Sequence, residues 1–379
     1  MGWVRGAAAG AAVVLVAAAA AGCTRGNGSG GSGPSAAADA AEAKPPVAAQ
    51  PPLVITQAEA EKVFHQFEWE RRTPVQWKSP DGLAKVATDP LLTGWRAATA
   101  LAAAQKDTIS SVSALTQPTF AIPAERDQPS HPRSFVVFSK ASGRESGQDT
   151  AVHYFVQEAP GGEWKAAVET WVATAAPGPL DTENVVKFTG LSVQLRKTAL
   201  GSVGRDAAGA ATLSATADAD RTVCGRFADY MSFTTPDEPE EDDRFAPGPL
   251  TDGMVRELGQ KAKKPKLKGL ITYAFEHEET GPRLPVLKLD NGTSLVACPL
   301  RRTEKMRGTD STVTFSFADG SDYGALLDDK GKKWRSWDAQ LSLTALIELP
   351  PAGTPGPAQV ASCNCVKPLL LEVTGKRVD

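Results

Sequence analysis

The sequence predicts an α+β fold in which helices precede antiparallel strands in each of two successive halves. Three observations support this prediction. Apolar residues recur at helical spacing near the start of each half, strand-like segments of alternating polarity follow, and turn sequences join those segments. About 325 of the 379 residues follow a Gly/Ser/Ala/Pro-rich N-terminal segment, which is more than one hydrophobic core usually organises and favours two domains.

The first 22 residues have the pattern of a secretory signal peptide. A leader with one cation, Arg5, precedes an uninterrupted run of small and apolar residues from Ala7 to Ala21. As a helix, this run would extend about 22 Å, which is too short for a hydrocarbon core of roughly 30 Å. We therefore expect residues 1–22 to be a signal peptide, followed by a soluble body.

The signal peptide ends in Ala20-Ala21-Gly22-Cys23, which resembles the lipobox of bacterial lipoproteins. The resemblance implies that Cys23 carries lipid, such as palmitate, and becomes the first residue of the mature protein. Ala20 departs from the family pattern, in which leucine is most frequent at that position. The alternative is an ordinary cleaved signal peptide with an incidental cysteine.

Residues 23–53 consist mainly of Gly, Ser, Ala and Pro. Such a segment cannot bury enough apolar surface to offset its conformational entropy, so we expect a disordered tether behind the lipidated Cys23. The membrane is then a partner through the lipid anchor. The expected location is the extracytoplasmic face of the cell membrane.

Charge gives little support for a nucleic-acid partner. Without Arg5 of the signal peptide, the chain has 40 Lys and Arg against 44 Asp and Glu, and no sustained basic stripe. An acidic run at 237–243 and a basic run at 261–268 are expected to be solvated. We therefore predict no nucleic acid among the partners.

The first half, residues 54–178, begins with two predicted helices. In "ITQAEAEKVFHQFEWERR", Thr56 and Glu59 form a capping box, and one helical face carries Ala60, Val63, Phe64 and Phe67. The second helix, "TDPLLTGWRAATALAAAQ", has Asp89 as its N-cap and Pro90 as its first residue. Strands then follow in "SFVVFSK", "AVHYFVQEA" and "EWKAAVETWVAT", the last two joined at Gly161-Gly162.

The second half, residues 217–375, repeats this order. "DADRTVCGRFADYMSF" and "TDGMVRELGQKAKK" predict helices, and the first places on one face Cys224, Phe227, Ala228 and Met231. Predicted strands follow in "LKGLITYAFEHE", "LPVLKLD", "TSLVACPLRR", "STVTFSFA", "WDAQLSLTALIEL" and a cysteine-containing strand that ends near Val373. Asn291-Gly292 predicts a hairpin turn. The connecting segment, 179–216, fits neither half and is expected to form two more strands or a link between domains.

The order of helix, helix and curved sheet resembles the cystatin-like cone of the nuclear transport factor two-like superfamily. Two such units behind a lipid anchor are similar to an uncharacterised family of actinobacterial lipoproteins. The resemblance covers about Val54 to Val373 and includes stretches such as "EWKAAVETW" and "LDNGTSLVACPLRRT". It implies two tandem cystatin-like domains, each with N-terminal helices packed on a curved antiparallel sheet.

Beyond Cys23, the chain has four cysteines, all in the second half: Cys224, Cys298, Cys363 and Cys365. An even number in an exported chain favours disulfides. Two residues apart on one strand, Cys363 and Cys365 would stand too far apart for good disulfide geometry. We therefore expect each to pair with Cys224 or Cys298. A Cu(I) or Zn(II) site at the Cys-x-Cys pair is the alternative.

Two histidines on predicted strands are candidates for a pocket inside the cones. Strand alternation places His277 on one face with Tyr273 and Phe275, and places His153 on a face with Phe155. Neither histidine has an assignable orienting partner in the sequence, so the alternative for each is a strand-end or surface position. His65 and His131 are expected on a solvated helix face and in a loop. The tryptophans are expected in cores and hairpins, including Trp69, Trp95 and Trp164.

The sequence contains none of the common catalytic signatures for serine hydrolases, zinc proteases or nucleotide-binding loops. The leading hypothesis is a non-enzymatic, membrane-anchored binding or accessory module that contacts an envelope protein and needs no cofactor or metal. The alternative is a carrier that holds a small apolar ligand or a lipid in the cone pockets. A third hypothesis is an enzyme with His277 or His153 as its base.

Overall fold

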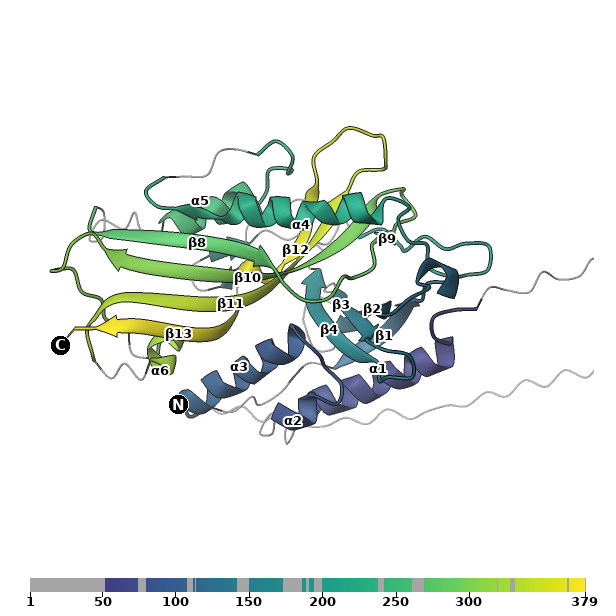
Figure 1. Cartoon of the computed structure of the whole chain (residues 1–379), viewed down its shortest axis with the longest axis horizontal. Coiled ribbons are helices and arrows are strands. Elements are labelled where there is room, and N and C mark those ends of the chain that lie inside the picture. Colours follow the sequence, from purple (N-terminus) through teal and green to yellow (C-terminus); the bar gives the residue numbers. More distant parts are fainter. Residues whose placement is uncertain are drawn as a thin grey trace, which may run out of the picture. The chain divides into compact units, whose positions relative to one another are not determined.

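The structure is a computed structural model with an α+β fold of a few helices and curled antiparallel sheets (Figure 1). Residues Ala49–Asp379 form one compact unit. The structure describes residues 52–73, 80–107, 112, 114–141, 150–172, 186–188, 191–193, 200–237, 242–260, 269–318, 320–327, 331–366 and 368–378. The predicted signal peptide, Cys23 and nearly all of the tether lie outside these residues. Within them, no helix is long and apolar enough to cross a membrane.

The first half contains a four-stranded antiparallel sheet in which sequence neighbours pair in the order β1-β2-β3-β4. Its strands are β1 (Leu115–Ala121), β2 (Arg133–Ala141), β3 (Thr150–Gln157) and β4 (Lys165–Val172). The helices of this half are α1 (Gln57–Arg72), α2 (Pro80–Leu83) and α3 (Leu91–Ala104), with a 3-10 turn, η2 (Glu125–Asp127). Helix α1 contacts β1 and β4 at the ends of the sheet.

The structure confirms the capping box and the buried face predicted for helix α1. The Thr56 side chain accepts from the Glu59 amide at 3.2 Å, and the Glu59 carboxylate accepts from the Thr56 amide at 3.1 Å. Both bonds satisfy N–H groups that have no partner inside the helix. Ala60, Phe64 and Phe67 are buried on one face, as their spacing indicates.

Two details of the first half differ from prediction. Helix α3 begins one residue later than expected, but the Asp89 carboxylate still accepts from the Thr93 amide at 3.1 Å. Strand β1, which contains Pro118, was not predicted. The strand tolerates this proline because it is at the edge of the sheet and its register shifts between Thr116 and Thr119.

The second half contains a larger antiparallel sheet, in the order β12-β11-β10-β8-β7, with β13 also paired to β11 and β9 to β10. Its strands are β7 (Phe233–Thr234), β8 (Ile271–Glu279), β9 (Leu287–Lys288), β10 (Ser294–Gly308), β11 (Trp334–Leu349), β12 (Gln359–Cys363) and β13 (Leu369–Arg377). The turn at Asn291-Gly292 is present, with Gly292 at a φ of 84°, where glycine is favoured.

The second half has two longer helices, α4 (Ala217–Met231) and α5 (Asp252–Gln260), which lie together beside β8 (Figure 1). The short α6 (Asp322–Leu326) lies beside β13 and also contacts α3 of the first half. Helix α4 contacts β8 and β10 and buries the four residues predicted for its apolar face. Helix α5 shares this core through Met254, Val255 and Leu258.

Two predicted strands of the second half are wrong. "STVTFSFA" forms only an isolated bridge, between Phe315 and Trp334. The cysteine-containing segment is broken into β12 and β13 by a 3-10 turn, η4 (Asn364–Val366). A run of alternating residues indicates extended backbone but not whether a neighbouring strand is in reach to pair with it.

The connecting segment contributes a small two-stranded sheet, β5 (Val186–Phe188) with β6 (Leu191–Val193), which corresponds to one of its two predicted forms. Farther along, residues 200–214 bridge the two halves. The Ala211 amide donates to Ile122 of the first half at 2.8 Å, and the Ser214 amide donates to Val286 of the second at 2.9 Å. A shared hydrophobic core accompanies these bonds, and includes Val152 and Val168 with Leu287, Leu295 and Leu346.

Candidate functional site

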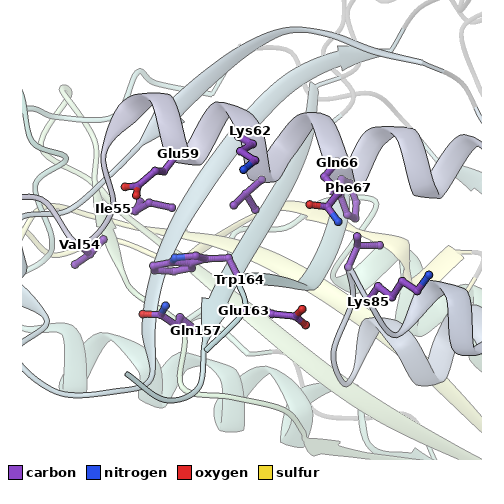
Figure 2. Close-up of a pocket in the computed structure, with 12 residues that line it drawn as sticks. Val54, Ile55, Glu59, Lys62, Gln66, Phe67, Lys85, Gln157, Glu163 and Trp164 are labelled. Atoms are coloured by element: carbon purple, nitrogen blue, oxygen red, sulfur yellow. The ribbon is translucent and has the colours of Figure 1, made fainter. Parts of the chain in front are cut away.

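A surface pocket of about 480 Å³ lies between helix α1 and the β3–β4 hairpin; we call it the α1–hairpin pocket (Figure 2). Residues from the chain before α1, from α1 itself, from the segment after α2 and from the hairpin converge there. Its lining residues are Val54, Ile55, Glu59, Lys62, Val63, Gln66, Phe67, Lys85, Val86, Gln157, Glu163 and Trp164. Its volume lies in the range of small-molecule sites.

The walls of this pocket are held in place by neighbouring structure. The Trp164 ring packs edge-on against Phe135 with centroids 5.1 Å apart. The Gln157 amide donates to the Gly162 carbonyl at 2.8 Å and lies 3.1 Å from His131 Nε2. Val86 bonds through its carbonyl to the Ala166 amide of β4 at 2.8 Å. The pocket is therefore largely preformed.

Some of the charged residues around the pocket already have a partner within the protein, and others do not. Glu59 is held by Thr56, whose hydrogen bonds to the carboxylate lower the pKa of Glu59. Glu163 lies 3.4 Å from Lys165. Among the described residues, neither Lys62 nor Lys85 has a carboxylate within 4.0 Å. The pocket therefore presents unpaired ammonium groups beside an apolar floor.

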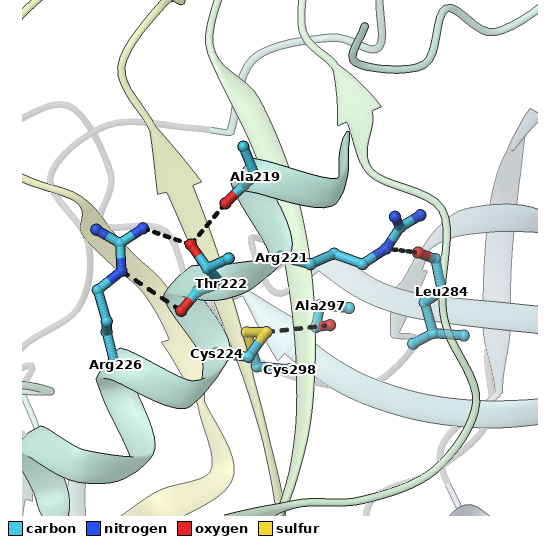
Figure 3. Close-up of a disulfide and its surroundings, with 8 residues drawn as sticks. All are labelled: Ala219, Arg221, Thr222, Cys224, Arg226, Leu284, Ala297 and Cys298. Carbon is cyan, nitrogen blue, oxygen red and sulfur yellow. Dashed lines mark hydrogen bonds between the residues drawn. A yellow bond between two sulfur atoms is a disulfide. The ribbon is translucent and has the colours of Figure 1, made fainter. Parts of the chain in front are cut away.

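A second pocket, of about 510 Å³, lies beside the Cys224–Cys298 disulfide, which joins α4 to β10 (Figure 3). Arg221 lines it and donates to the Leu284 carbonyl at 2.9 Å and to Asp218 at 2.8 Å. Burial lowers the pKa of Arg221, although Asp220 opposes that shift. Arg283 also pairs with Asp218, so both guanidinium groups are engaged within the protein.

The cysteine pairing corrects the sequence prediction. Cys363 and Cys365 are bonded to each other, not to separate partners, and their Cα atoms are 5.0 Å apart. In a continuous strand, residues two apart would stand about 6.6 Å from each other. The strand instead ends at Cys363 and η4 begins at Asn364, which shortens the separation into the range of disulfides.

His153 is fully buried beneath α1 and does not line either pocket. Its ring packs edge-on against Phe67 at 5.1 Å, and its Nε2 lies 3.8 Å from the Glu169 carboxylate. Burial raises the pKa of Glu169, but His153 and the positive charge of Arg71 outweigh this and lower it overall. Arg71, which is 2% exposed, also pairs with Glu68 at 2.9 Å. We call these four residues the first ionic cluster.

Tyr273 and Phe275 are buried in the core of the second half, and His277 follows on the same strand. The Tyr273 hydroxyl donates to the Glu304 carboxylate at 2.5 Å. Burial and the adjacent Arg302 lower the pKa of His277 to about 3, although Glu304 opposes this. Neither ring nitrogen of His277 has a hydrogen-bond partner among the described residues.

Glu304 and Arg302 form the centre of a second ionic cluster on β10. The two side chains are 0% and 3% exposed and pair at 2.8 Å. Tyr323 of α6 also donates to Glu304, at 3.1 Å. Sequence reasoning placed Tyr273 and His277 on one face of β8 but did not predict the ion pair beside them.

Other predicted features have mixed outcomes. Trp69 is 71% exposed on α1, so its assignment to a core is wrong, while Trp95 is buried as predicted. His65 is exposed on α1. The basic run at 261–268 and part of the acidic run lie outside the described residues. Within the described part of the chain, no group of three or more His, Cys, Asp or Glu side chains is arranged to hold a metal.

The α1–hairpin pocket was not predicted from the sequence. Its aromatic wall residue, Trp164, was expected only in a core or hairpin. Lys62 and Lys85 carry no sequence pattern that relates one to the other. Comparison with protein-family models, curated proteins and solved structures found no match to this chain.

Proposed function

We propose that this chain is a membrane-anchored extracytoplasmic lipoprotein, lipidated at Cys23, whose α+β body is a non-enzymatic binding module. The observation that carries the binding role is the α1–hairpin pocket, a preformed surface pocket with unpaired cations. His153, Tyr273 and Phe275, which would line a cone pocket, are instead packed in the interior. This packing favours binding at the surface, to an envelope protein or a small ligand, over a carrier that holds its cargo inside a cone.

We also propose that the two halves are tandem cystatin-like domains of a lipoprotein family similar to those of actinobacteria. The support is the repeated order of helices followed by a curled antiparallel sheet, with α4 and α5 along one face of the second sheet. An experimental structure with those helices on the convex face of the sheet would contradict the cystatin-like assignment.

The anchoring part of the proposal is tested by metabolic labelling with radioactive palmitate in an exporting bacterial host. The wild-type chain should be labelled and should enter the detergent phase on phase separation, whereas Cys23→Ala should lose the label. Ser29→Ala, in the same expected tether, is the matched control and should be labelled normally. Labelled Cys23→Ala would refute lipidation at that residue.

The binding part is tested by native mass spectrometry of the mature chain, released gently in detergent. Extra mass that is lost on denaturation would identify a small-molecule ligand. A bare mass would direct the search to protein partners by crosslinking in intact cells. If neither ligand nor crosslinked partner is found, the binding role is wrong even if the anchor is confirmed.

A further inference from the structure

Apolar and aromatic residues form part of the lining of the α1–hairpin pocket. Phe67 and Val86 are buried at its base, and the Trp164 ring forms the wall opposite α1 (Figure 2). Aromatic faces favour planar partners that stack or pack edge-on against them. Because Phe135 already holds Trp164, a ligand would not have to order that side chain on binding.

The charges at the rim determine which polar group the ring should carry. Lys62 projects from α1 and Lys85 from the segment after α2, and both side chains are exposed at the mouth. The two acids of the pocket already have partners: Glu59 accepts from the α1 cap and is stabilised by the charge of Lys62, and Glu163 lies 3.4 Å from Lys165. The groups left to bind a ligand are therefore the two ammonium groups and the Gln66 amide, which favour an anionic group.

We propose that the α1–hairpin pocket binds a small planar-ring compound with one anionic group, its ring against Trp164 and Phe67 and its anion near Lys62 and Lys85. This ligand assignment rests on the binding role proposed above and specifies the chemistry of the ligand. The chemistry required is a ring of one or two fused cycles bearing a carboxylate, phosphate or sulfonate. A free aromatic acid and an aromatic group on a larger envelope molecule share this chemistry.

The test uses two fluorescent probes with almost the same ring system and different charge. 1-Anilinonaphthalene-8-sulfonate carries a sulfonate, and N-phenyl-1-naphthylamine lacks it. Each is titrated into the mature full-length chain, and the dissociation constants are compared among variants. Binding of the anionic probe at one site per chain, tighter than the neutral probe, is the expected result.

The first variant, Lys62→Gln/Lys85→Gln, removes only the two surface charges and should fold normally. We expect about a tenfold weaker affinity for the anionic probe, because two exposed ion pairs contribute up to about 1 kcal/mol each. Its affinity for the neutral probe should not change. Lys333→Gln/Lys376→Gln, with two exposed lysines of the second half, is the charge-matched control and should leave both affinities unchanged.

The second variant, Trp164→Leu, tests the site of the ring and should lower the affinity for both probes. Trp69→Leu, on the exposed side of α1, should leave both affinities unchanged. Circular dichroism checks that each variant is folded. Equal loss in the lysine variant and its control, or no binding to the wild-type chain, would overturn the inference. Neither outcome bears on lipidation of Cys23 or on binding to a protein partner, because the labelling and crosslinking experiments test these separately.

Competition distinguishes the two sources of the ligand. Naphthoate, a free aromatic acid, should displace the anionic probe if the site accepts small acids directly. Displacement by extracted envelope material but not by naphthoate would show that the aromatic group belongs to a larger molecule. Failure of both to displace a probe that depends on Lys62 and Lys85 would overturn the assigned ligand chemistry.

Discussion

Each half of the protein buries an arginine with carboxylates, but the two ionic clusters are built differently. In the first half, Arg71 pairs with Glu68 at 2.9 Å and approaches Glu169 at 3.8 Å, and both acids keep 12% of their side-chain surface exposed. In the second half, Glu304 is completely buried and receives Arg302 together with two tyrosine hydroxyls.

The clusters differ in the kind of donor more than in the number of donors. Glu68, which is 12% exposed, accepts from Arg71 at 2.9 Å and from the Leu115 amide at 2.9 Å, and water can supply further hydrogen bonds. A carboxylate without solvent must receive them from the protein, since an unsatisfied buried charge costs several kcal/mol. The tyrosines are affected in turn. Burial and the negative charge of Glu304 raise the pKa values of Tyr273 and Tyr323, so both hydroxyls remain neutral donors.

The largest difference between the clusters should be revealed by removing each arginine. Arg302→Met should lower the free energy of unfolding by roughly 3 to 5 kcal/mol, because it leaves Glu304 in the interior without its cation. Arg71→Met should cost less, roughly 1 to 3 kcal/mol, since Glu68 also contacts Arg72 and the Leu115 amide. Urea denaturation followed by far-ultraviolet circular dichroism measures both.

A double variant, Arg302→Met/Glu304→Leu, is the control for this prediction. It removes the stranded charge, so it should recover much of the stability lost in Arg302→Met. Equal losses in Arg302→Met and Arg71→Met would show that solvent contact does not separate the two clusters.

The disulfides offer a second contrast, within the second half. Cys224 and Cys298 are 74 residues apart, whereas Cys363 and Cys365 are 2 apart. A longer closed loop restricts the unfolded chain more, so Cys224→Ala/Cys298→Ala should cost roughly 2 to 4 kcal/mol and Cys363→Ala/Cys365→Ala on the order of 1 kcal/mol. The same denaturation series measures both, and thiol titration of the unfolded wild-type chain should find the four cysteines oxidised. A larger loss from the 363–365 pair would contradict the loop argument.

The smallest predicted effect is a difference in pH dependence between the halves. The pKa of His277 falls from its usual 6.5 to about 3 in the folded protein, so the unfolded chain binds an extra proton between these values. Stability should therefore be complete above pH 6.5 and fall by about 1 kcal/mol between pH 6.5 and 5.5. Glu169, whose pKa is also lowered, stabilises the fold above pH 4.5 and loses that contribution only in stronger acid.

Two substitutions separate these windows. His277→Gln removes the titrating group and should flatten the dependence of stability on pH between 6.5 and 4.5, and should also reduce the fall between pH 4.5 and 3. Glu169→Gln should leave the slope between pH 6.5 and 4.5 unchanged and reduce only the fall below pH 4.5. Denaturation midpoints measured every half pH unit give the dependence of stability on pH for each variant. An unchanged slope between pH 6.5 and 4.5 in His277→Gln would show that His277 is not the group responsible.

Features that depend on a few consecutive residues were predictable. The capping box at Thr56 and Glu59 begins α1, and the spacing of Phe64 and Phe67 gives its buried face. The Asn291-Gly292 turn and the buried alternation of Tyr273 and Phe275 followed from the same local rules. Each is determined by backbone preferences and side-chain direction over one or two turns or strands.

Only the tertiary structure decided which distant residues meet. Arg71 approaches Glu169, and Lys62 and Trp164 line one pocket. The bond between Cys363 and Cys365, although they are only two residues apart, also depends on the 3-10 turn that ends β12. Sequence by itself determined where the helices and most strands form and which faces they bury, since those follow from local periodicity. The ionic clusters, the disulfide pairing and the pocket depend on how the sheets curl and how their helices pack, because contacts between distant segments leave no regular spacing in the chain.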